Sequence, residues 1–277
     1  MPEPTSNSLV NVGDLGKPAN TLIKRVSDLF EGAFRPAQIK RVAKAEAEAA
    51  LIKANGEIAV TDLQRRAARR FLAEESVFQE NMESITTKSL PLLNDAAKPE
   101  EVEEDWLRNF YSKCRPVSNE QMQELWAKIL ANEINKPGSF SFRTVNAVGS
   151  LSLAEAKNFE MVCRFTVSSS MGPIPMFLDL KMDVYKIHGI KMGILIMLDS
   201  IGLIRLSEQL VDYSVIPEGG PVFVACAGET FIMDKPFPVG KVLFTPIGLD
   251  LCKIVKVDPI PEFEALVKNT LKAAQQK

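Results

Sequence analysis

The sequence of 277 residues predicts a mainly α protein with a small α+β part at its carboxyl end. Before Thr166, apolar residues recur at three- and four-residue spacing, which is typical of helices that bury one face. After Thr166, short β-rich pieces alternate with turns that contain Gly and Pro. Because the chain is longer than a typical single domain, we expect two or three structural units.

We divide the chain into four parts. Residues 1–18 are rich in Pro, Ser, Asn and Gly and are predicted to form a flexible arm. An N-terminal long-helix region over 19–98 and a central helical domain over 99–182 follow. Residues 183–277 are predicted to form a winged-helix-like α+β domain.

Residues 19–34 predict an amphipathic helix with Leu22, Val26 and Leu29 on one side. Such a face packs on a neighbouring helix or, alternatively, makes peripheral contact with a membrane surface. The polar face carries mixed charge, which favours packing.

Residues 37–54 and 62–90 predict two long helices joined near Asn55-Gly56. Together they predict an N-terminal helical hairpin, with Leu63 and Phe71 among the apolar residues of the second helix. Hairpins of this kind often pair between subunits, so we expect a homo-oligomer.

Two helix-start signals bracket the core of a central helical array. Ser118 with Gln121, and Ser152 with Glu155, fit the capping box, in which each side chain bonds a free backbone N–H. The apolar stripe between them consists of Met122, Leu125, Trp126, Ile129 and Leu130.

A Pro-Gly pair ends this predicted helix. Pro137 and Gly138 cannot comfortably continue it, and Ser141 can cap a shorter helix beyond the turn. The aromatic residues Trp106, Phe110 and Tyr111 are predicted to anchor the same core.

The last part combines helices and strands. Residues 189–204 predict a buried helix that ends at Gly202, and Thr245 with Pro246 begins another helix. Three strand candidates lie between them, at 222–225, 230–233 and 241–244. This order of elements looks like a winged-helix module.

No catalytic motif is visible in the sequence, so we predict a protein that is not an enzyme. His188 is the only histidine, and its neighbours favour a turn or packing position over a catalytic or metal-binding one. The four cysteines are too far apart for the usual zinc or redox spacing. We therefore predict no catalytic residue, no cofactor and no metal ligand.

The sequence favours a cytoplasmic protein. No basic start precedes an apolar block, and no apolar run approaches the roughly 20 residues that span a bilayer. The 33 basic and 35 acidic residues are nearly balanced, which argues against nucleic-acid binding driven by bulk charge.

One feature has electrostatic character, and we call it the arginine stripe. It consists of four arginines on adjacent turns of one predicted helix: Arg65, Arg66, Arg69 and Arg70. These guanidinium groups can engage phosphates or an acidic partner surface. Pairing of Asp62 with Arg65 and of Glu74 with Arg70 would absorb part of the charge. A solvated face, or one that pairs between subunits, is favoured over phosphate binding.

A winged-helix module suggests DNA binding, because one of its helices can enter the major groove. Here the predicted helix is almost uniformly apolar from Lys191 to Leu198, and residues 222–244 carry only Lys235 and Lys241 as basic residues. This composition favours a structural or protein-binding use of the module.

Motifs over almost the whole chain resemble a bacterial family known only as domain of unknown function 2806. They are Gly13-Asp14-Leu15, Lys17-Pro18-Ala19, the helix at 37–50, Asp62 to Arg66, Leu125 to Leu130, Pro137 to Ser141, His188-Gly189-Ile190 and Thr245 to Gly248. The Gly16-Lys17-Pro18 start, Leu125 to Leu130 and Leu151 to Ala156 are more distantly similar to the abortive-infection alpha family, which is linked to phage resistance. The resemblance implies no catalytic residues.

Two functions remain open. The first is a non-enzymatic, self-associating regulatory or scaffold protein in phage defence, with a protein partner for the C-terminal module. The alternative is a nucleic-acid-binding protein that uses the arginine stripe and that module.

Overall fold

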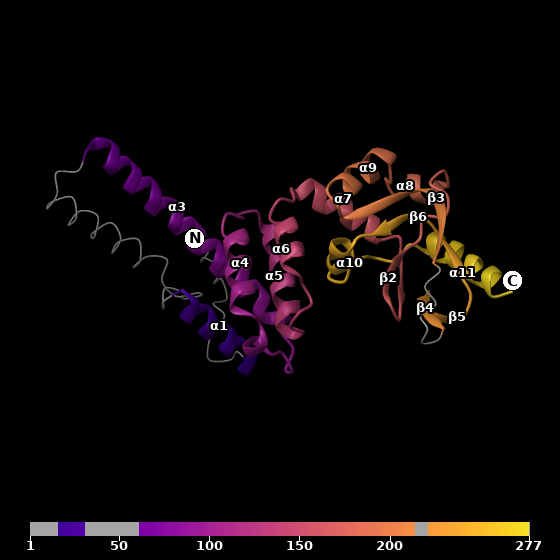
Figure 1. The fold of residues 1–277 in the computed structure, drawn as a ribbon, viewed down its shortest axis with the longest axis horizontal. Coiled ribbons are helices and arrows are strands. Elements are labelled where there is room, and N and C mark those ends of the chain that lie inside the picture. Colours follow the sequence, from indigo (N-terminus) through magenta and orange to yellow (C-terminus); the bar gives the residue numbers. More distant parts are fainter. Residues whose placement is uncertain (1–15, 31–60, 214–220, 277) are drawn as a thin grey trace, which may run out of the picture. The chain divides into compact units, whose positions relative to one another are not determined.

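A computed structural model describes residues 16–30, 61–213 and 221–276 of the chain. The chain divides into two compact units, Met1–Gly149 and Ser150–Lys277. The described part of the first unit is helical, and all described strands lie in the second unit (Figure 1). This confirms the predicted class of a mainly α protein with a small α+β part at its carboxyl end. In the described part of the chain, no helix is both long enough and apolar enough to cross a membrane.

The first unit is built from helices and short 3-10 turns. Its elements are α1 (Lys17–Leu29), α3 (Asp62–Ser89), the 3-10 turns Leu90–Leu92 and Pro99–Glu101, α4 (Glu104–Cys114), α5 (Glu120–Asn135) and α6 (Phe142–Val148). The predicted helix at 37–54 and residues 1–15 of the predicted arm lie outside the described residues. The helical hairpin therefore stays a prediction.

The helix caps follow the sequence closely, with one correction. The N-cap of α5 is Asn119, whose side chain accepts a hydrogen bond from the Met122 N–H at 3.1 Å. The capping box predicted for Ser118 is wrong, because Asn119 supplies the same acceptor one residue later. Ser141 caps α6 as predicted.

An aromatic cluster fills the centre of the first unit. Trp106, Phe110 and Tyr111 of α4 are buried beside Trp126 of α5, which confirms them as core anchors. The Phe110 ring stacks on Trp106 and meets Trp126 edge-on, in both cases with 5.2 Å between ring centroids. Such pairs add to the stability gained from burying the rings.

The apolar face of α1 is buried within the same unit. Leu22 and Val26 have no exposed surface, and the Phe30 ring just after α1 lies edge-on to Tyr111 at 5.4 Å. The favoured packing of this helix on its neighbours agrees with the burial of its apolar side chains.

The Pro137-Gly138 turn is held by a buried carboxylate. Glu133 is only 3% exposed, and its two oxygens accept hydrogen bonds from the N–H groups of Gly138 at 2.6 Å and Phe140 at 2.8 Å. The carbonyl of Phe140 accepts a 2.7 Å bond from the Trp106 indole. Burial raises the pKa of Glu133, while the backbone N–H groups oppose that rise. Glu133 thus holds the turn that follows α5, and the Phe140 carbonyl links this turn to Trp106 of α4.

The second unit contains helices around two small sheets. Its elements are α7 (Leu153–Cys163), β1 (Thr166–Ser169), β2 (Gly172–Pro175), α8 (Asp183–Ile187), α9 (Met192–Ser200), β3 (Ile204–Tyr213), β4 (Val222–Cys226), β5 (Glu229–Met233), β6 (Phe237–Phe244), α10 (Pro246–Cys252) and α11 (Pro261–Gln275). The strand order is β2-β1-β4-β5 in one sheet and β3-β6 in the other, and the pairs are antiparallel. The capping box of Ser152 with Glu155 is confirmed at the start of α7.

The three predicted strands are present as β4, β5 and β6, but they do not form one continuous hairpin. β4 and β5 pair with each other, with Phe223 opposite Ile232, whereas β6 pairs with β3. The predicted helix at 189–204 is shorter, because Gly189 adopts a positive φ of 83° and α9 begins only at Met192. Its predicted end is confirmed by Gly202, with φ of 76°.

The division between the two compact units falls at Gly149, and the finer division predicted at residues 99 and 183 stays a prediction. Ser168 of β1 pairs with Ala225 of β4, which joins residues after 150 to the C-terminal strands. In the first unit, the Asn81 amide of α3 donates to the Arg115 carbonyl at 2.8 Å, which links α3 to the residue that follows α4.

A close backbone crossing joins β6 to the segment after β2. The Phe177 N–H donates to the Val239 carbonyl at 2.8 Å, and the Lys241 N–H donates to the Phe177 carbonyl at 3.3 Å. Gly240 lies between these two bonds, with a positive φ of 98°. The crossing requires a residue without a side chain.

The core of the second unit is aromatic as well. The rings of Phe177, Tyr185 and Phe263 surround Phe165, with centroids 5.1–5.5 Å from its own. Tyr185 donates its hydroxyl to the Met176 carbonyl at 2.9 Å, and burial raises the pKa of Tyr185 to about 12. His188 ends α8 and packs edge-on against Phe165, which agrees with the predicted packing position.

Candidate functional site

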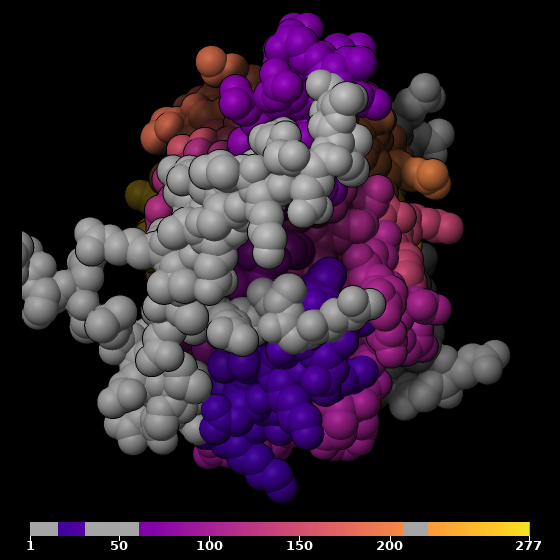
Figure 2. Space-filling view, turned by 90° about the vertical axis from the view of Figure 1, so that its left-hand side faces the viewer, coloured from indigo at the N-terminus to yellow at the C-terminus, as the bar shows by residue number. Residues whose placement is uncertain are grey.

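The candidate site lies on α3, a helix of 28 residues whose two halves differ in burial. Met82 and Ile85 near the end of α3 are buried, whereas Leu63 and Phe71 in its first half and Val77 just beyond the middle are 68%, 59% and 49% exposed. Figure 1 shows the first half of α3 extending beyond α4 and α5, and Figure 2 shows the same helix, in purple, at the top of the view. Leu63 and Phe71, apolar residues of the predicted helical pattern, are therefore exposed.

The second half of α3 is fixed to α5 through one glutamine. The amide group of Gln123 donates to the Asn81 side chain at 3.1 Å, and its oxygen accepts bonds from Ser84 at 2.9 Å and Lys88 at 2.7 Å. This buried polar seam holds the helix axis in place. The first half of α3 therefore extends from a segment that is held in place by α5.

The start of α3 carries a capping box. The Thr61 hydroxyl accepts a hydrogen bond from the Gln64 N–H at 3.3 Å, and the Gln64 side chain accepts one from the Thr61 N–H at 3.0 Å. This reciprocal pair satisfies two backbone donors at the helix start. The helix that presents the arginine stripe therefore has a defined first turn.

Two arginines of the stripe are paired within the helix. Arg66 bonds Asp62 at 3.1 Å, and Arg70 bonds Glu74 at 3.0 Å, both with i, i+4 spacing. The prediction that Arg70 pairs with Glu74 is confirmed. Asp62, however, pairs with Arg66 and not with Arg65, because residues four apart lie one above the other on a helix.

The other two arginines are available for a partner. Among the residues that the structure describes, Arg65 and Arg69 form no ion pair; Arg65 is half-buried and Arg69 is exposed. The two existing pairs are exposed, and such pairs contribute only about 0.3–0.5 kcal/mol each. They can be exchanged for pairs with another molecule at little cost.

The apolar and the basic residues occupy neighbouring faces of α3. With about 100° of rotation per residue, Leu63 and Phe71 lie about 80° apart, and Arg66 and Arg70 border them on one side. Arg65 and Arg69 lie beyond Arg66 and Arg70 in the same direction around the helix axis. An exposed apolar stripe bordered by charge is the arrangement by which helices pair with helices.

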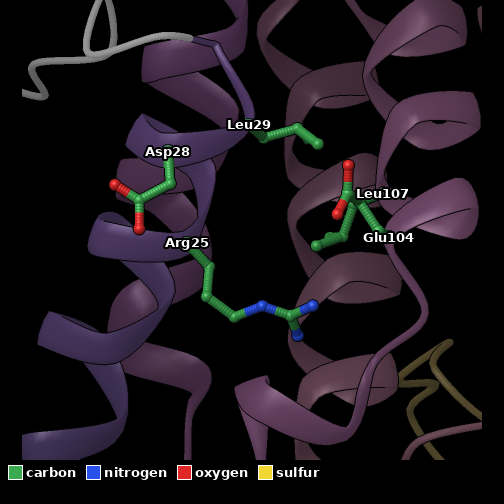
Figure 3. A pocket seen from close by; sticks show the side chains of 5 residues that line it. All are labelled: Arg25, Asp28, Leu29, Glu104 and Leu107. Atoms are coloured by element: carbon green, nitrogen blue, oxygen red, sulfur yellow. The ribbon is translucent and has the colours of Figure 1, made fainter.

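A pocket of about 270 Å³ lies between α1 and α4. It is lined by Arg25, Asp28, Leu29, Glu104 and Leu107 (Figure 3). The Arg25 guanidinium donates to the Pro99 carbonyl, and Glu104 pairs with Arg108 at 2.6 Å. Because these charges already have protein partners and the volume is below that of typical ligand sites, we assign no ligand to it. No sequence motif indicated this pocket.

The segment around α8 and α9 of the second unit presents apolar side chains at its surface. Ile187 of α8 and Met192 and Ile196 of α9 are 79%, 53% and 56% exposed. Lys191 is the basic residue at the start of α9. A helix with this surface offers few side-chain donors and acceptors of the kind that read base edges.

Fold and site together define a two-unit, mainly helical protein that presents a long helix with an exposed apolar and basic half. The chain belongs to the family described as protein of unknown function (DUF2806), whose sequence profile matches residues 65–268. The match begins at Arg65, so it includes the arginine stripe. Searches of curated proteins and of solved structures find no match.

Proposed function

We propose that this protein is a non-enzymatic, self-associating regulator or scaffold, and that the first half of α3 is its self-association surface. The observation that carries the proposal is the exposure of Leu63 and Phe71 in the first half of α3, with Val77 just beyond it, on a helix whose last turns are buried. Large apolar side chains that gather on one rigid surface are typical of interaction sites.

The charge order along α3 supports pairing with a second copy. The arginine stripe over 65–70 is followed by a block with the opposite charge: Glu74, Glu75, Glu80 and Glu83. In an antiparallel pair, the basic block of each copy faces the acidic block of the other. A two-fold interface requires this kind of self-complementary surface.

Removing the apolar contacts should weaken self-association. We expect the double substitution Leu63→Ser and Phe71→Ser to raise the dimer dissociation constant at least tenfold, about 1.4 kcal/mol, because apolar area would stay in water. Sedimentation equilibrium measures the constant. Phe142→Ser, which changes an aromatic residue that is 41% exposed on α6, is the matched control and should leave association unchanged. Equal dissociation constants for the double variant and wild type would reject α3 as the interface.

Charge reversal tests the antiparallel arrangement. Arg65→Glu with Arg69→Glu, and separately Glu74→Arg with Glu80→Arg, should each weaken self-association. A mixture of the two variant chains should associate again, since every facing pair then has opposite charges. Failure of the mixture to associate would contradict this arrangement of the helices.

We propose phage defence as the setting of this scaffold. The support is the distant similarity of Leu125 to Leu130 and of the Gly16-Lys17-Pro18 start to the abortive-infection alpha family. Expression of the chain with and without Leu63→Ser and Phe71→Ser in a phage-infected host tests it. Protection by the wild type alone is the expected result, and no protection by either would reject the setting.

The second candidate is nucleic-acid binding through the arginine stripe, assisted by the winged-helix-like module. Two observations favour it. Arg65 and Arg69 have no ion pair within the described residues, and α9 is followed by Gly202 and by β3 paired antiparallel with β6, an order typical of winged helices. The cytoplasm, where we place the protein, offers nucleic-acid partners.

Salt-dependent binding distinguishes this candidate. Fluorescence anisotropy with duplex DNA should show affinity that falls steeply with salt, by a log–log slope of about −0.9 for each phosphate contacted. Replacing the four arginines by Glu should abolish binding, while Phe142→Ser should not. A wild-type chain that does not bind at low salt would remove the candidate.

A further inference from the structure

β5 forms one edge of the four-stranded sheet in the second unit. The strand order is β2-β1-β4-β5, so β5 pairs with β4 on one side and with no described strand on the other (Figure 1). Proline or charge at an edge strand prevents pairing with another chain. β2, at the opposite edge, has this protection, because Pro173 and Pro175 lack backbone N–H groups. β5 contains no proline, and the charge of Glu229 is paired with Lys268 of α11 at 2.7 Å.

The turn between β4 and β5 determines which backbone groups of β5 reach this edge. Ala227 and Gly228 both have positive φ, 48° and 75°, which is the conformation of a type I′ turn in a two-residue hairpin. In such a hairpin the pair of residues that flanks the turn is hydrogen-bonded, and bonded pairs then alternate along the strands. Thr230 and Ile232 therefore direct their N–H and C=O groups away from β4.

Two contacts agree with this assignment. The Gln275 side chain of α11 donates to the Ile232 carbonyl at 3.0 Å, so this carbonyl points to the outer edge. Phe223 lies opposite Ile232, and its carbonyl accepts a 2.9 Å bond from the Ser170 N–H, on the side of β4 that faces β1. Among the described residues, the Thr230 N–H and C=O and the Ile232 N–H have no hydrogen-bond partner.

The side chains of β5 leave this edge open to solvent. Thr230 is exposed, and Ile232 is 53% exposed beside Phe223, which is 47% exposed on the same face of the sheet. Phe231 and Met233 point to the opposite face and are buried. Burial of its inner face thus holds β5 in place, while its outer edge is accessible.

We propose that β5 pairs antiparallel with β5 of a second copy of this chain, about a two-fold axis at Thr230. Unpaired N–H and C=O groups at strand spacing are complementary to another extended strand. In a hydrogen-bonded antiparallel pair, two residues exchange both N–H···O bonds. Thr230 is the residue of β5 whose outward N–H and C=O are both free, so it fits the position on the axis.

The neighbouring groups fit the same register. With Thr230 on the axis, Ile232 lies opposite Gly228 of the second copy. The trans peptide between Gly228 and Glu229 directs its N–H toward β4, so its carbonyl, that of Gly228, points to the outer edge and can accept the Ile232 N–H. The Ile232 carbonyl keeps its bond to Gln275. The groups that are free are therefore the ones that this pairing uses.

The pairing joins two sheets into one continuous sheet that ends at β2 on both sides, where the prolines prevent further pairing. The contact is self-complementary, as a two-fold interface requires. It lies in the second unit and does not depend on α3, which lies in the first. Where both contacts form, pairs made through α3 are linked through β5 into longer assemblies.

Disulfide trapping of the full chain tests the proposal. Thr230→Cys places a thiol at the two-fold axis, where the Cα atoms of a hydrogen-bonded pair lie about 5.5 Å apart, a distance that a disulfide spans. The four native cysteines are buried. Oxidised glutathione should convert most of this variant to a disulfide-linked dimer. Ser168→Cys, at an exposed position of β1 in the same sheet, is the matched control and should remain mostly monomeric.

Both variants also carry Leu63→Ser and Phe71→Ser, so that contacts through α3 do not contribute. The result therefore stands whether or not α3 is a self-association surface. Equal cross-linking of the Thr230→Cys and Ser168→Cys chains, or no cross-linking of either, would overturn the pairing of β5.

Proline substitution tests the backbone bonds themselves. Ile232→Pro removes an outward N–H that β4 does not use, whereas Ile232→Val keeps this N–H. In the Thr230→Cys chain, Ile232→Pro should slow cross-linking about tenfold, because two intermolecular hydrogen bonds are lost, and Ile232→Val should leave the rate unchanged. Circular dichroism verifies that both fold. Equal rates for the two variants would contradict the proposed register.

Hydrogen exchange of the unmodified chain gives a test that needs no variant. We expect the amides of β5, Glu229–Met233, to exchange more slowly as protein concentration rises, because pairing protects the outward N–H groups. The edge strand β2, Gly172–Pro175, is the internal control and should exchange equally at all concentrations. Exchange of β5 that does not change with concentration, together with the absence of cross-linking, would reject the proposal.

Discussion

Replacing Gly240 by alanine is expected to destabilise the second unit by at least ~4 kcal/mol, enough to unfold many domains. A Cβ atom at this position would lie 1.8 Å from the Phe177 carbonyl oxygen and 2.2 Å from its carbon. Both neighbours are backbone atoms, and the flanking hydrogen bonds of Phe177 and Lys241 prevent them from moving apart. The positive φ of 98° adds strain for any residue with a side chain.

A second glycine provides the control for the conformational part of this effect. Gly202 also has a positive φ, of 76°, but an added Cβ would meet nothing within 4 Å. Gly202→Ala should therefore cost only about 1 kcal/mol. Urea unfolding followed by circular dichroism measures both variants. If Gly240→Ala and Gly202→Ala lowered the free energy of unfolding by similarly small amounts, the close backbone crossing at Phe177 would be contradicted.

Glu133→Ala is expected to lower the free energy of unfolding of the first unit by about 3 kcal/mol, the second large effect. The substitution leaves the buried N–H group of Phe140, and the less buried N–H group of Gly138, without their acceptor. It also releases the turn that positions the Phe140 carbonyl for Trp106. Glu133→Gln should have an intermediate effect, because an amide offers only one acceptor oxygen.

Tryptophan fluorescence reports this unfolding specifically, because Trp106 and Trp126 are the two tryptophans of the chain and both lie in the first unit. The exposed Glu124 on the same helix is the control, and Glu124→Ala should change stability by less than about 0.5 kcal/mol. A loss for Glu133→Ala as small as that of Glu124→Ala would contradict the role of the buried carboxylate.

Local signals predicted much of the fold. Helix ends depend on short-range hydrogen bonds and on the backbone preference of single residues, so they could be predicted from the sequence alone. Examples are Ser152 with Glu155, Thr245 before Pro246, and Gly202. The burial of Trp126 likewise follows from its helical spacing.

Pairing between distant segments could not be predicted in the same way. β1 and β2 are rich in Ser, Gly and Pro, which disfavour strands, yet Val167 and Ile174 are buried opposite each other in a hairpin. Pro175 is tolerated because β2 is an edge strand. The pairing of β1 with β4 joins residues after Ser150 to the C-terminal strands in one unit.

The candidate site was predicted only in part. The helix that carries the arginine stripe and the pair of Arg70 with Glu74 were found from spacing. The exposure of Leu63 and Phe71 was not, because periodicity shows that a face is apolar but does not show which molecule covers it.

Sedimentation velocity of the unmodified full chain over a wide concentration range tests the central claim most directly. Self-association through α3 predicts a species with twice the mass of one chain, or a higher multiple, whose fraction grows with concentration. A single species with the mass of one chain at every concentration, including the highest that stays in solution, would contradict the account.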